Sequence, residues 1–525
     1  MRQSTRYFIL WYGLFETFVF TGNIFGWTAL HYMLRQEGIY EHLCDNSTLG
    51  TAYPNVTNTA ELKQVSPPRT CDRQDSLLNL AYTVGSFCMG STSFVWGFLL
   101  DTWGLRNVRL IINGLITSGC ILLSLTIRET SFLLFPSLIL ICVAGVPLRL
   151  ANMQIADLFP EHRSTIITLY SGAFTASASV FVFIKYGFDA GLPWEWACFL
   201  LVVLSALMLP VTLFVLPADS FLPGTPKGLF TGKQEKEVTS VAPCVWGTFT
   251  YIPEDPPPPP YTSSLRKSAK GKKESNSTPS QKNSGREEPS QDEKGALEET
   301  RPSLRESFFS ASYMLHQYWF CWILLYTIIY VGTLHLWAER TTTDRSEDSL
   351  FSEIYGICQV TGLFLAPIAG VFMDWSIRGV AKGDSDPNTR LLRVLRSCFW
   401  PMFLTTLLEV AAQVCKFFDH RYAIYVSIVA VTLLRAFFIS IGTAYLRIRF
   451  PAEHFNKLLG IMSTFSAIAS LFQFPLFLWE SSSLDNVLYV NIFDSICLAI
   501  ALIHPILLIV TPAQKYFLKR KNTSS

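Results

Sequence analysis

The feature that most constrains this chain is a series of long segments without a charged residue. A helix that crosses the hydrocarbon core of a membrane needs about 20 apolar residues, and a charge at its centre costs at least ~2.5 kcal/mol. Nine uncharged runs approach or exceed this length: 76–100, 110–127, 130–148, 164–184, 196–218, 307–338, 354–373, 458–479 and 495–514. They indicate a chain that crosses a membrane many times.

Three further apolar stretches contain a single internal charge. Glu16 interrupts 7–34, Glu409 interrupts 397–415, and Arg435 interrupts 422–446. The first stretch is too long for a cleaved signal peptide, contains a carboxylate, and has no clean cleavage site after it. We therefore expect it to be retained, which gives twelve transmembrane helices in an all-α membrane protein.

The composition excludes several other classes of protein. Half of the residues are hydrophobic and only 16% are charged, against about 25% in soluble proteins. The net charge of +2 argues against a nucleic-acid binder. The chain has no HExxH, GxSxG, Walker A or dinucleotide glycine motif, and its 12 cysteines form no CxxC pair or metal-ligand spacing. We expect no enzyme activity, no cofactor and no metal.

Lysine and arginine predict the orientation. If both termini are cytoplasmic, the short inner loops and tails hold 17 of these residues and the short outer loops hold 6, in agreement with the positive-inside rule. The loop 35–75 is then outside and carries glycosylation sequons at Asn46 and Asn55. Cys44 and Cys71 are the only cysteines in this loop, so an oxidising exterior favours a disulfide between them.

The segment 217–312 separates the sixth and seventh spans. It is rich in Ser, Pro, Lys and Glu, a composition typical of a disordered cytoplasmic loop. Within it, Pro258, Pro259 and Tyr261 belong to a Pro-Pro-Pro-Tyr string that fits the polyproline ligand of WW domains. Recruitment of a ubiquitin ligase and a merely stiff spacer both remain open.

The two halves repeat each other. Gly97-Phe-Leu-Leu-Asp101 ends the second span, and Gly370-Val-Phe-Met-Asp374 ends the eighth, 273 residues later. A Phe-Pro pair followed by Glu-His ends both the fourth and the tenth spans. Two matches with the same span offset predict an amino-terminal six-helix bundle over 1–216 and a carboxy-terminal one over 313–525, as in the major facilitator architecture. The Gly97, Asp101 and Arg106 string also resembles the signature of that superfamily.

Residues inside the spans are the candidates for function. Glu16 is predicted to act in gating or structure, together with Gly97, Asp101, Arg106, Gly370 and Asp374. Arg435 is predicted to face either Glu16 or a substrate. The alternative is that Glu16 and Arg435 form a structural ion pair that holds the two halves in register. Amide groups donate and accept hydrogen bonds, and aromatic rings stack on flat ligands. The candidate substrate-binding set is Asn23, Trp27, Asn152, Gln154, Tyr170, Gln359, Arg435, Gln473 and Phe474.

Several strings resemble solute carrier family 43 of the major facilitators. They are the segment 161–174, Phe25-Gly-Trp27, Gly332-Thr-Leu334, 451–457 and 471–475. The family contains carriers of large neutral amino acids and of nucleobases, and the strings 161–174 and 471–475 are closer to the nucleobase branch. Arg149 matches neither branch.

The resemblance implies sodium- and proton-independent transport of purine nucleobases such as adenine, guanine and hypoxanthine across the plasma membrane. The partners would be that small-molecule substrate and membrane lipid. Two rival hypotheses remain. The first is a uniporter of large neutral amino acids, and the second is a receptor or scaffold without transport activity that acts through the 217–312 loop.

Overall fold

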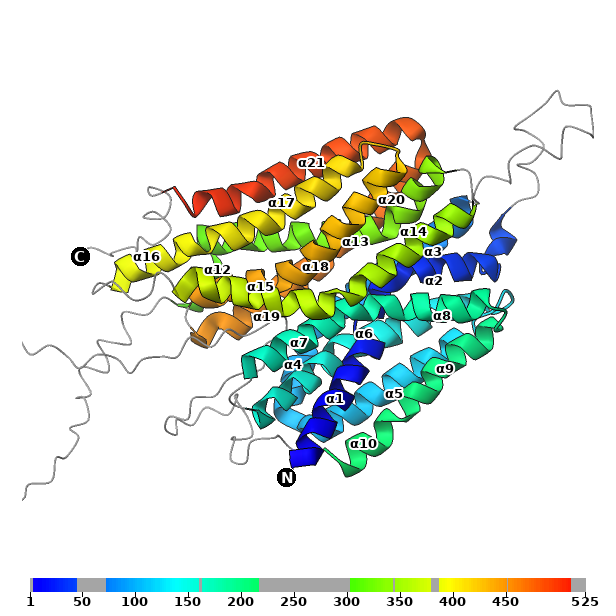
Figure 1. Cartoon of the computed structure of the whole chain (residues 1–525), viewed down its shortest axis with the longest axis horizontal. Helices are drawn as coiled ribbons and strands as arrows, with labels where there is room; N and C mark the ends of the chain where they lie inside the picture. The colour runs from blue at the N-terminus through cyan, green and yellow to red at the C-terminus, as the bar shows by residue number, and fades with distance from the viewer. Residues whose placement is uncertain are drawn as a thin grey trace, which may run out of the picture.

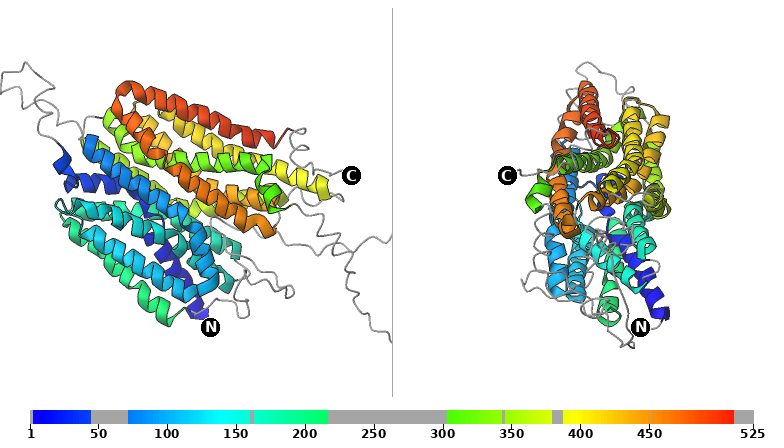
Figure 2. Two further views of the ribbon diagram at one scale, coloured as in Figure 1. Left: turned by 180° about the vertical axis from the view of Figure 1, so that it is seen from behind. Right: turned by 90° about the vertical axis from the view of Figure 1, so that its left-hand side faces the viewer.

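The computed structural model describes residues 3–44, 72–159, 163–216, 303–342, 345–378, 387–450 and 452–510. Every regular element within these ranges is a helix. The helices form two bundles that lie side by side, with α1 to α10 in one and α12 to α21 in the other (Figures 1 and 2). The described ends of the chain, at the start of α1 and the end of α21, lie toward the same end of the molecule (Figure 1).

The amino-terminal bundle contains ten α-helices and several short 3₁₀ segments. Its elements are α1 (Gln3–Phe20), η1 (Asn23–Gly26), α2 (Trp27–Gln36), η2 (Glu41–Leu43), α3 (Asp72–Ser91), α4 (Ser93–Trp103), α5 (Leu105–Ser124), η5 (Ser131–Leu133), α6 (Leu134–Met153), η6 (Gln154–Leu158), α7 (Arg163–Ala176), η8 (Ser177–Ser179), α8 (Val180–Asp189), α9 (Trp194–Ala206) and α10 (Met208–Phe214).

The carboxy-terminal bundle has the same helical character. Its elements are α12 (Leu304–Phe308), α13 (Ala311–Thr341), α14 (Arg345–Val360), α15 (Gly362–Arg378), α16 (Pro387–Ser397), α17 (Phe399–Cys415), α18 (Arg421–Arg449), α19 (Ala452–Ser470), α20 (Gln473–Ser482) and α21 (Leu484–Leu507). Residues 304–308 of the predicted loop thus form α12, and residues 311–312 begin α13. A capping box between Ser303 and Glu306 begins α12.

The sequence predicts twelve membrane spans, and the described helices account for 9 to 11 of them. Nine helices or continuous helix pairs of the described ranges are long and apolar enough to cross a membrane, and two bent pairs raise the number to 11. The predicted span 76–100 corresponds to α3 and α4, which are not among these 11.

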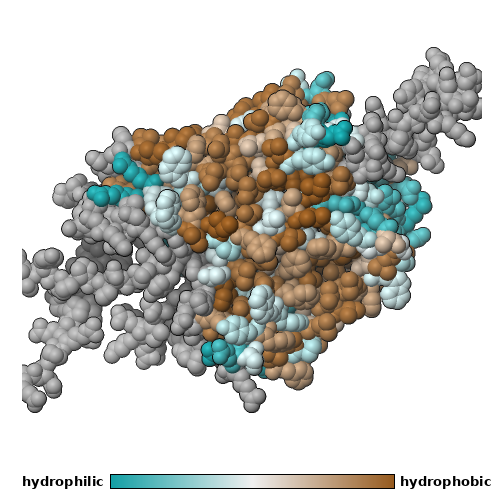
Figure 3. Space-filling model, viewed as in Figure 1, coloured by the Kyte–Doolittle hydropathy of each residue, from teal (hydrophilic) through white to brown (hydrophobic). Residues whose placement is uncertain are grey.

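Large hydrophobic side chains such as Phe364 and Trp375 are exposed on the outside of the bundles, and hydrophobic surface covers much of the visible face (Figure 3). A lipid-facing surface explains this exposure.

The first span is broken rather than continuous. The helix axis turns by 49° between α1 and the η1–α2 segment. At the break, a Cβ atom on Gly22 would lie 2.5 Å from the carbonyl oxygen of Phe174, and one on Gly145 would lie 2.5 Å from that of Thr21. Only glycine permits such close backbone approach. The break brings η1 into the middle of the molecule.

Helices of the two bundles pack closely through α7 and α15. A Cβ on Gly172 would lie 2.8 Å from the backbone of Leu363, and one on Gly362 would lie 2.6 Å from the Thr175 side chain. Small residues let membrane helices approach this closely. We call this contact, made by Gly172 and Gly362, the glycine seam.

Several predicted features fall outside the described residues. These are Asn46, Asn55, Cys71, the Pro258–Tyr261 string and the side chains of Asp101 and Asp374, although α4 and α15 contain the backbone of the two aspartates. Cys44 is disulfide-bonded.

Gly104 joins α4 to α5 with a φ of 78°, a conformation that favours glycine. Arg106 donates a hydrogen bond of 2.6 Å to the carbonyl oxygen of Leu216.

Candidate functional site

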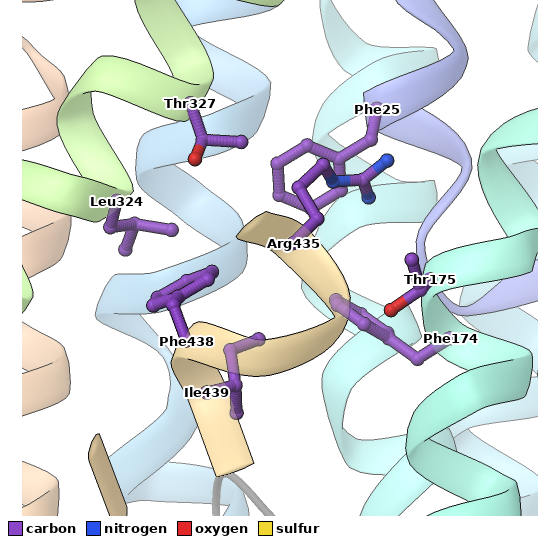
Figure 4. Close-up of a pocket in the computed structure, with 8 residues that line it drawn as sticks. All are labelled: Phe25, Phe174, Thr175, Leu324, Thr327, Arg435, Phe438 and Ile439. Carbon is purple, nitrogen blue, oxygen red and sulfur yellow. The ribbon is translucent and has the colours of Figure 1, made fainter. Parts of the chain in front are cut away.

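A small pocket lies between the two bundles near the middle of the molecule. Eight residues from η1, α7, α13 and α18 line it: Phe25, Phe174, Thr175, Leu324, Thr327, Arg435, Phe438 and Ile439 (Figure 4). The free space among them is about 10 Å³, room for about one water molecule. A larger ligand therefore requires the bundles to move apart.

Arg435 is the charged residue of this lining. Its Nη1 donates hydrogen bonds to Oε1 of Gln359 at 2.5 Å and to the Tyr355 hydroxyl at 3.3 Å. Its guanidinium carbon lies 4.3 Å from the centre of the Phe25 ring, a cation–π contact with the other bundle. The side chain of Gln359 is itself held by Thr432, whose Oγ1 accepts from Nε2 at 2.8 Å. The described partners of Arg435 are therefore neutral.

Glu16 pairs with a different arginine. Nη2 of Arg109 lies 2.8 and 2.6 Å from the two carboxylate oxygens of Glu16, and both side chains are buried. Nη1 of Arg109 also donates to Oδ1 of Asn152, whose Nδ2 donates to Oγ1 of Thr17 at 3.0 Å. The interpretation in which Glu16 faces Arg435 is wrong. This buried network joins α1, α5 and α6 within one bundle.

Arg149 contributes a second cation near the pocket. It is 1% exposed, and its guanidinium carbon lies 4.7 Å from the centre of the Phe174 ring. The rings of Phe25 and Phe174 meet edge to face, with their centres 6.0 Å apart. Two guanidinium groups from different bundles, Arg149 on α6 and Arg435 on α18, thus flank one pair of aromatic rings.

The remaining candidates lie outside the pocket lining. Trp27 is fully buried and stacks on Tyr82 at 5.2 Å between ring centres. Tyr170 donates a hydrogen bond of 3.1 Å to the carbonyl oxygen of Leu10. Asn23 is buried beside the pocket residue Phe25 on η1, and its Oδ1 has no hydrogen-bond partner among the described residues.

Gln473 links the bundles at another place. Its Nε2 donates to Oδ1 of Asn79 at 2.6 Å, and its Oε1 accepts from the Thr83 hydroxyl. Gln154 and Phe474 are only partly buried, on η6 and α20. Of the predicted substrate-binding residues, Arg435 is the one in the lining, and Gln359 is in contact with it.

Polar contacts between the bundles gather toward the end where α2 finishes and α3 begins, which we call the α2/α3 end. Arg35 on α2 forms an ion pair of 2.6 Å with Glu339 on α13. Lys185 on α8 pairs with Glu353 on α14. Asn79 donates to the carbonyl oxygen of Gly332 at 2.9 Å. The bundles are therefore joined at this end.

The sequence-based set omitted several of these groups. Arg109 directly precedes the uncharged run 110–127 and Lys185 directly follows the run 164–184, so both positions predict loop residues. Phe438 follows Arg435 by three positions on α18 and so shares its helix face. This spacing is a signal that could have placed Phe438 in the lining. The partner of Glu16 has no comparable signal, because sequence spacing says nothing of contacts between helices.

Comparison with known proteins decides the family. The model of the Major Facilitator Superfamily matches residues 42–395, more than half of the chain. The chain belongs to the Major Facilitator Superfamily. This assignment confirms the predicted fold class, and it makes the protein a multi-pass membrane transporter rather than an enzyme.

Two relatives correspond to the two branches of the expected resemblance. This superfamily member is 28% identical over 505 residues to equilibrative nucleobase transporter 1 of Bos taurus, covering 94% of both chains. It is 27% identical over 511 residues to large neutral amino acids transporter small subunit 3 of Homo sapiens, covering 90% of this chain and 87% of that protein. The resemblance to solute carrier family 43 is thus confirmed.

A solved structure supports the fold alone. The crystal structure of the human organic anion transporter MFSD10 (TETRAN) aligns with a TM-score of 0.51 at 11% identity, over 95% of this chain and 100% of that one.

Proposed function

We propose that the protein is a facilitative transporter of purine nucleobases in the plasma membrane, with both termini cytoplasmic. The observation that carries this proposal is the chemistry of the central pocket. Phe25, Phe174 and Phe438 offer aromatic surface to a flat heterocycle. Arg435 adds a hydrogen-bond donor, and none of the eight described lining residues carries a negative charge.

The charge of the pocket separates the two candidate substrate classes. A neutral amino acid carries an ammonium and a carboxylate, so its site needs acceptors for the first and donors for the second. The buried carboxylate on the first span, Glu16, is held by Arg109, and the charged groups described at the pocket are Arg149 and Arg435. This arrangement favours a neutral ring with acceptor atoms over a zwitterion.

Arg435 also suggests which edge of a base is recognised. Its two hydrogen bonds to described side chains use one nitrogen, Nη1. A guanidinium has five donors and no acceptor, so Nε and Nη2 can serve a ligand. The O6 and N7 atoms of guanine and hypoxanthine are two adjacent acceptors that suit this fork, whereas adenine presents a donor at N6. The proposed preference is for 6-oxopurines over adenine.

One feature favours the second candidate, a uniporter of neutral amino acids. The 49° break between α1 and η1 lies next to the pocket residue Phe25. Broken membrane helices expose backbone groups that bind charged parts of a substrate. The carbonyl groups at the carboxy-terminal end of α1 could take the ammonium group, and Arg435 the carboxylate.

A neutral base needs no counter-ion, so the proposed mechanism requires no sodium or proton coupling. Alternating access then needs two conformations of similar free energy. In the described conformation the pocket has room for about one water molecule, and the bundles are joined at the α2/α3 end. Substrate entry would require separation of α7 and η1 from α13 and α18.

The test is uptake of radiolabelled hypoxanthine, adenine and leucine, side by side, in transfected cells. The variant Arg435→Gln should lose most hypoxanthine uptake at unchanged surface expression. Arg128→Gln is the matched control, because Arg128 is 59% exposed and is not among the residues that line the pocket. Saturable leucine uptake without purine uptake would overturn the proposal in favour of the amino-acid carrier.

A further inference from the structure

Three potential metal ligands meet between the bundles near the α2/α3 end. His31 lies on α2 and Asp75 on α3, whereas His335 lies on α13 of the other bundle. One ligand atom from each residue lies within 4.8 Å of the others, and all three residues are buried. Nε2 of His31 is 3.3 Å from Oδ1 of Asp75, and the two imidazole rings have their centres 4.1 Å apart.

The polar atoms of this cluster lack normal hydrogen bonds. Within the described part of the chain, Nε2 of His31, Nε2 of His335 and both carboxylate oxygens of Asp75 are buried without a hydrogen-bond partner. Oδ1 of Asp75 lies only within ion-pair distance of Nε2 of His31 and Nε of Arg35, at 3.3 and 3.5 Å. Leaving such groups unsatisfied is costly, and in native proteins each such group calls for an explanation. A bound metal ion, which accepts lone pairs from several ligand atoms at once, would explain these unsatisfied groups.

The distances suit a small transition-metal ion. Zinc takes four ligands in a tetrahedron, with bonds to nitrogen and oxygen of about 2.0–2.2 Å, so neighbouring ligand atoms lie about 3.4 Å apart. The 3.3 Å between His31 and Asp75 matches this edge. The ligand atom of His335 lies within 4.8 Å of the other two, so it would have to move closer by up to about 1.4 Å to reach the same separation. Two imidazoles and a carboxylate suit zinc better than magnesium or calcium, which prefer oxygen ligands.

Arg35 is the competing cation. Its Nε lies 3.5 Å from Oδ1 of Asp75, but its Nη1 is 2.6 Å from Oε1 of Glu339. The shorter contact gives Arg35 a carboxylate of its own. An ion bound to Asp75 can therefore displace Nε and leave the Arg35–Glu339 pair in place.

We propose that His31, Asp75 and His335 form a binding site for Zn²⁺ that bridges the two bundles. His31 lies 5 positions before the last residue of α2, Asp75 lies 3 after the first residue of α3, and His335 lies 6 before the last residue of α13. The ion would therefore reach the site from the α2/α3 end. Because the ligands come from both bundles, the ion binds best when this end is closed. A ligand that prefers one conformation shifts the population toward it. Bound zinc therefore slows the alternation between conformations and inhibits transport.

The first test is thermal unfolding of the purified full-length protein in detergent, with ZnCl₂ titrated and MgCl₂ as the comparison. Binding to the folded state raises the melting temperature in a concentration-dependent way. We expect a saturable rise with zinc and none with magnesium. The variants His31→Ala and His335→Ala should weaken the apparent affinity for zinc at least tenfold. His42→Ala, which removes an exposed histidine, should leave it unchanged.

A second pair of variants separates metal binding from misfolding. His335→Cys retains a zinc ligand and should keep the zinc-dependent rise that His335→Ala loses. An equal rise in wild type, His31→Ala and His335→Ala would overturn the proposal, as would no rise in wild type. In cells, added zinc should inhibit uptake by wild type and by His42→Ala. It should not inhibit uptake by His335→Ala. The unfolding measurement uses no substrate, so its result is independent of whether the protein carries nucleobases.

Discussion

The buried pair of Glu16 and Arg109 provides the sharpest prediction about what holds the amino-terminal bundle together. Glu16 is 1% exposed and Arg109 is 2% exposed, and Nη2 of Arg109 contacts both carboxylate oxygens. Replacing Arg109 by Met leaves the carboxylate of Glu16 buried without its cation. Removing one partner of a buried ion pair costs ~3–5 kcal/mol. We therefore expect Arg109→Met to lower the melting temperature by several degrees.

The double variant Glu16→Gln/Arg109→Met tests the reason for this loss. With both charges removed, no unpaired ion stays buried, and a neutral replacement of similar volume can be nearly as stable as the pair. The double variant should recover most of the stability that Arg109→Met loses. The assay is thermal unfolding of the detergent-solubilised protein. Its readout is the fraction of protein that stays monodisperse on size exclusion after heating.

A surface pair serves as the control for this cycle. Arg128 lies 3.4 Å from Glu41, and the two side chains are 59% and 51% exposed. Exposed pairs contribute ~0–1 kcal/mol, so Arg128→Gln should change the melting temperature very little. Additive losses in the double variant, with Glu16→Gln and Arg109→Met each destabilising independently, would refute the coupling that the geometry requires.

Three further outcomes follow from the pocket and the seam. Gly172→Leu should abolish uptake at normal surface expression, because its Cβ would meet the Leu363 backbone at 2.8 Å; Gly114→Ala is the control, since a Cβ there meets nothing within 4 Å. Gln154→Leu should change the Michaelis constant for hypoxanthine less than twofold if the described lining is the site, and a large rise would return Gln154 to the substrate-binding set. Uptake should vary little between pH 6 and 8, because the eight described lining residues include no carboxylate and no histidine; a steep proton-dependent rise in rate would show coupling.

The sequence predicted the architecture because the bilayer imposes a coarse rule. Uncharged runs locate spans whatever the tertiary contacts are, and the repeated glycine and aspartate strings at Gly97 and Gly370 reveal the duplication. The sequence also identified Arg435 as a charge inside the membrane. These features depend on local composition, which a single chain displays directly.

Contacts between helices were harder to predict. The uncharged run 110–127 begins just after Arg109, which predicts that this arginine lies in a loop. In the structure α5 begins at Leu105 and Arg109 is buried. Gln473 looks like a ligand for a planar base but instead meets Asn79 and Thr83 across the bundles. An amide inside a membrane needs a partner, and the sequence does not say whether that partner is substrate or protein.

The most direct test of the central claim uses the purified protein in liposomes that contain no other transporter. Vesicles loaded with unlabelled hypoxanthine are diluted into a trace of labelled hypoxanthine, with no sodium and no pH gradient. We expect transient counterflow accumulation of label, abolished in Arg435→Gln and retained in Arg128→Gln. Label that enters no faster than into protein-free vesicles, while labelled leucine does show counterflow, would contradict it.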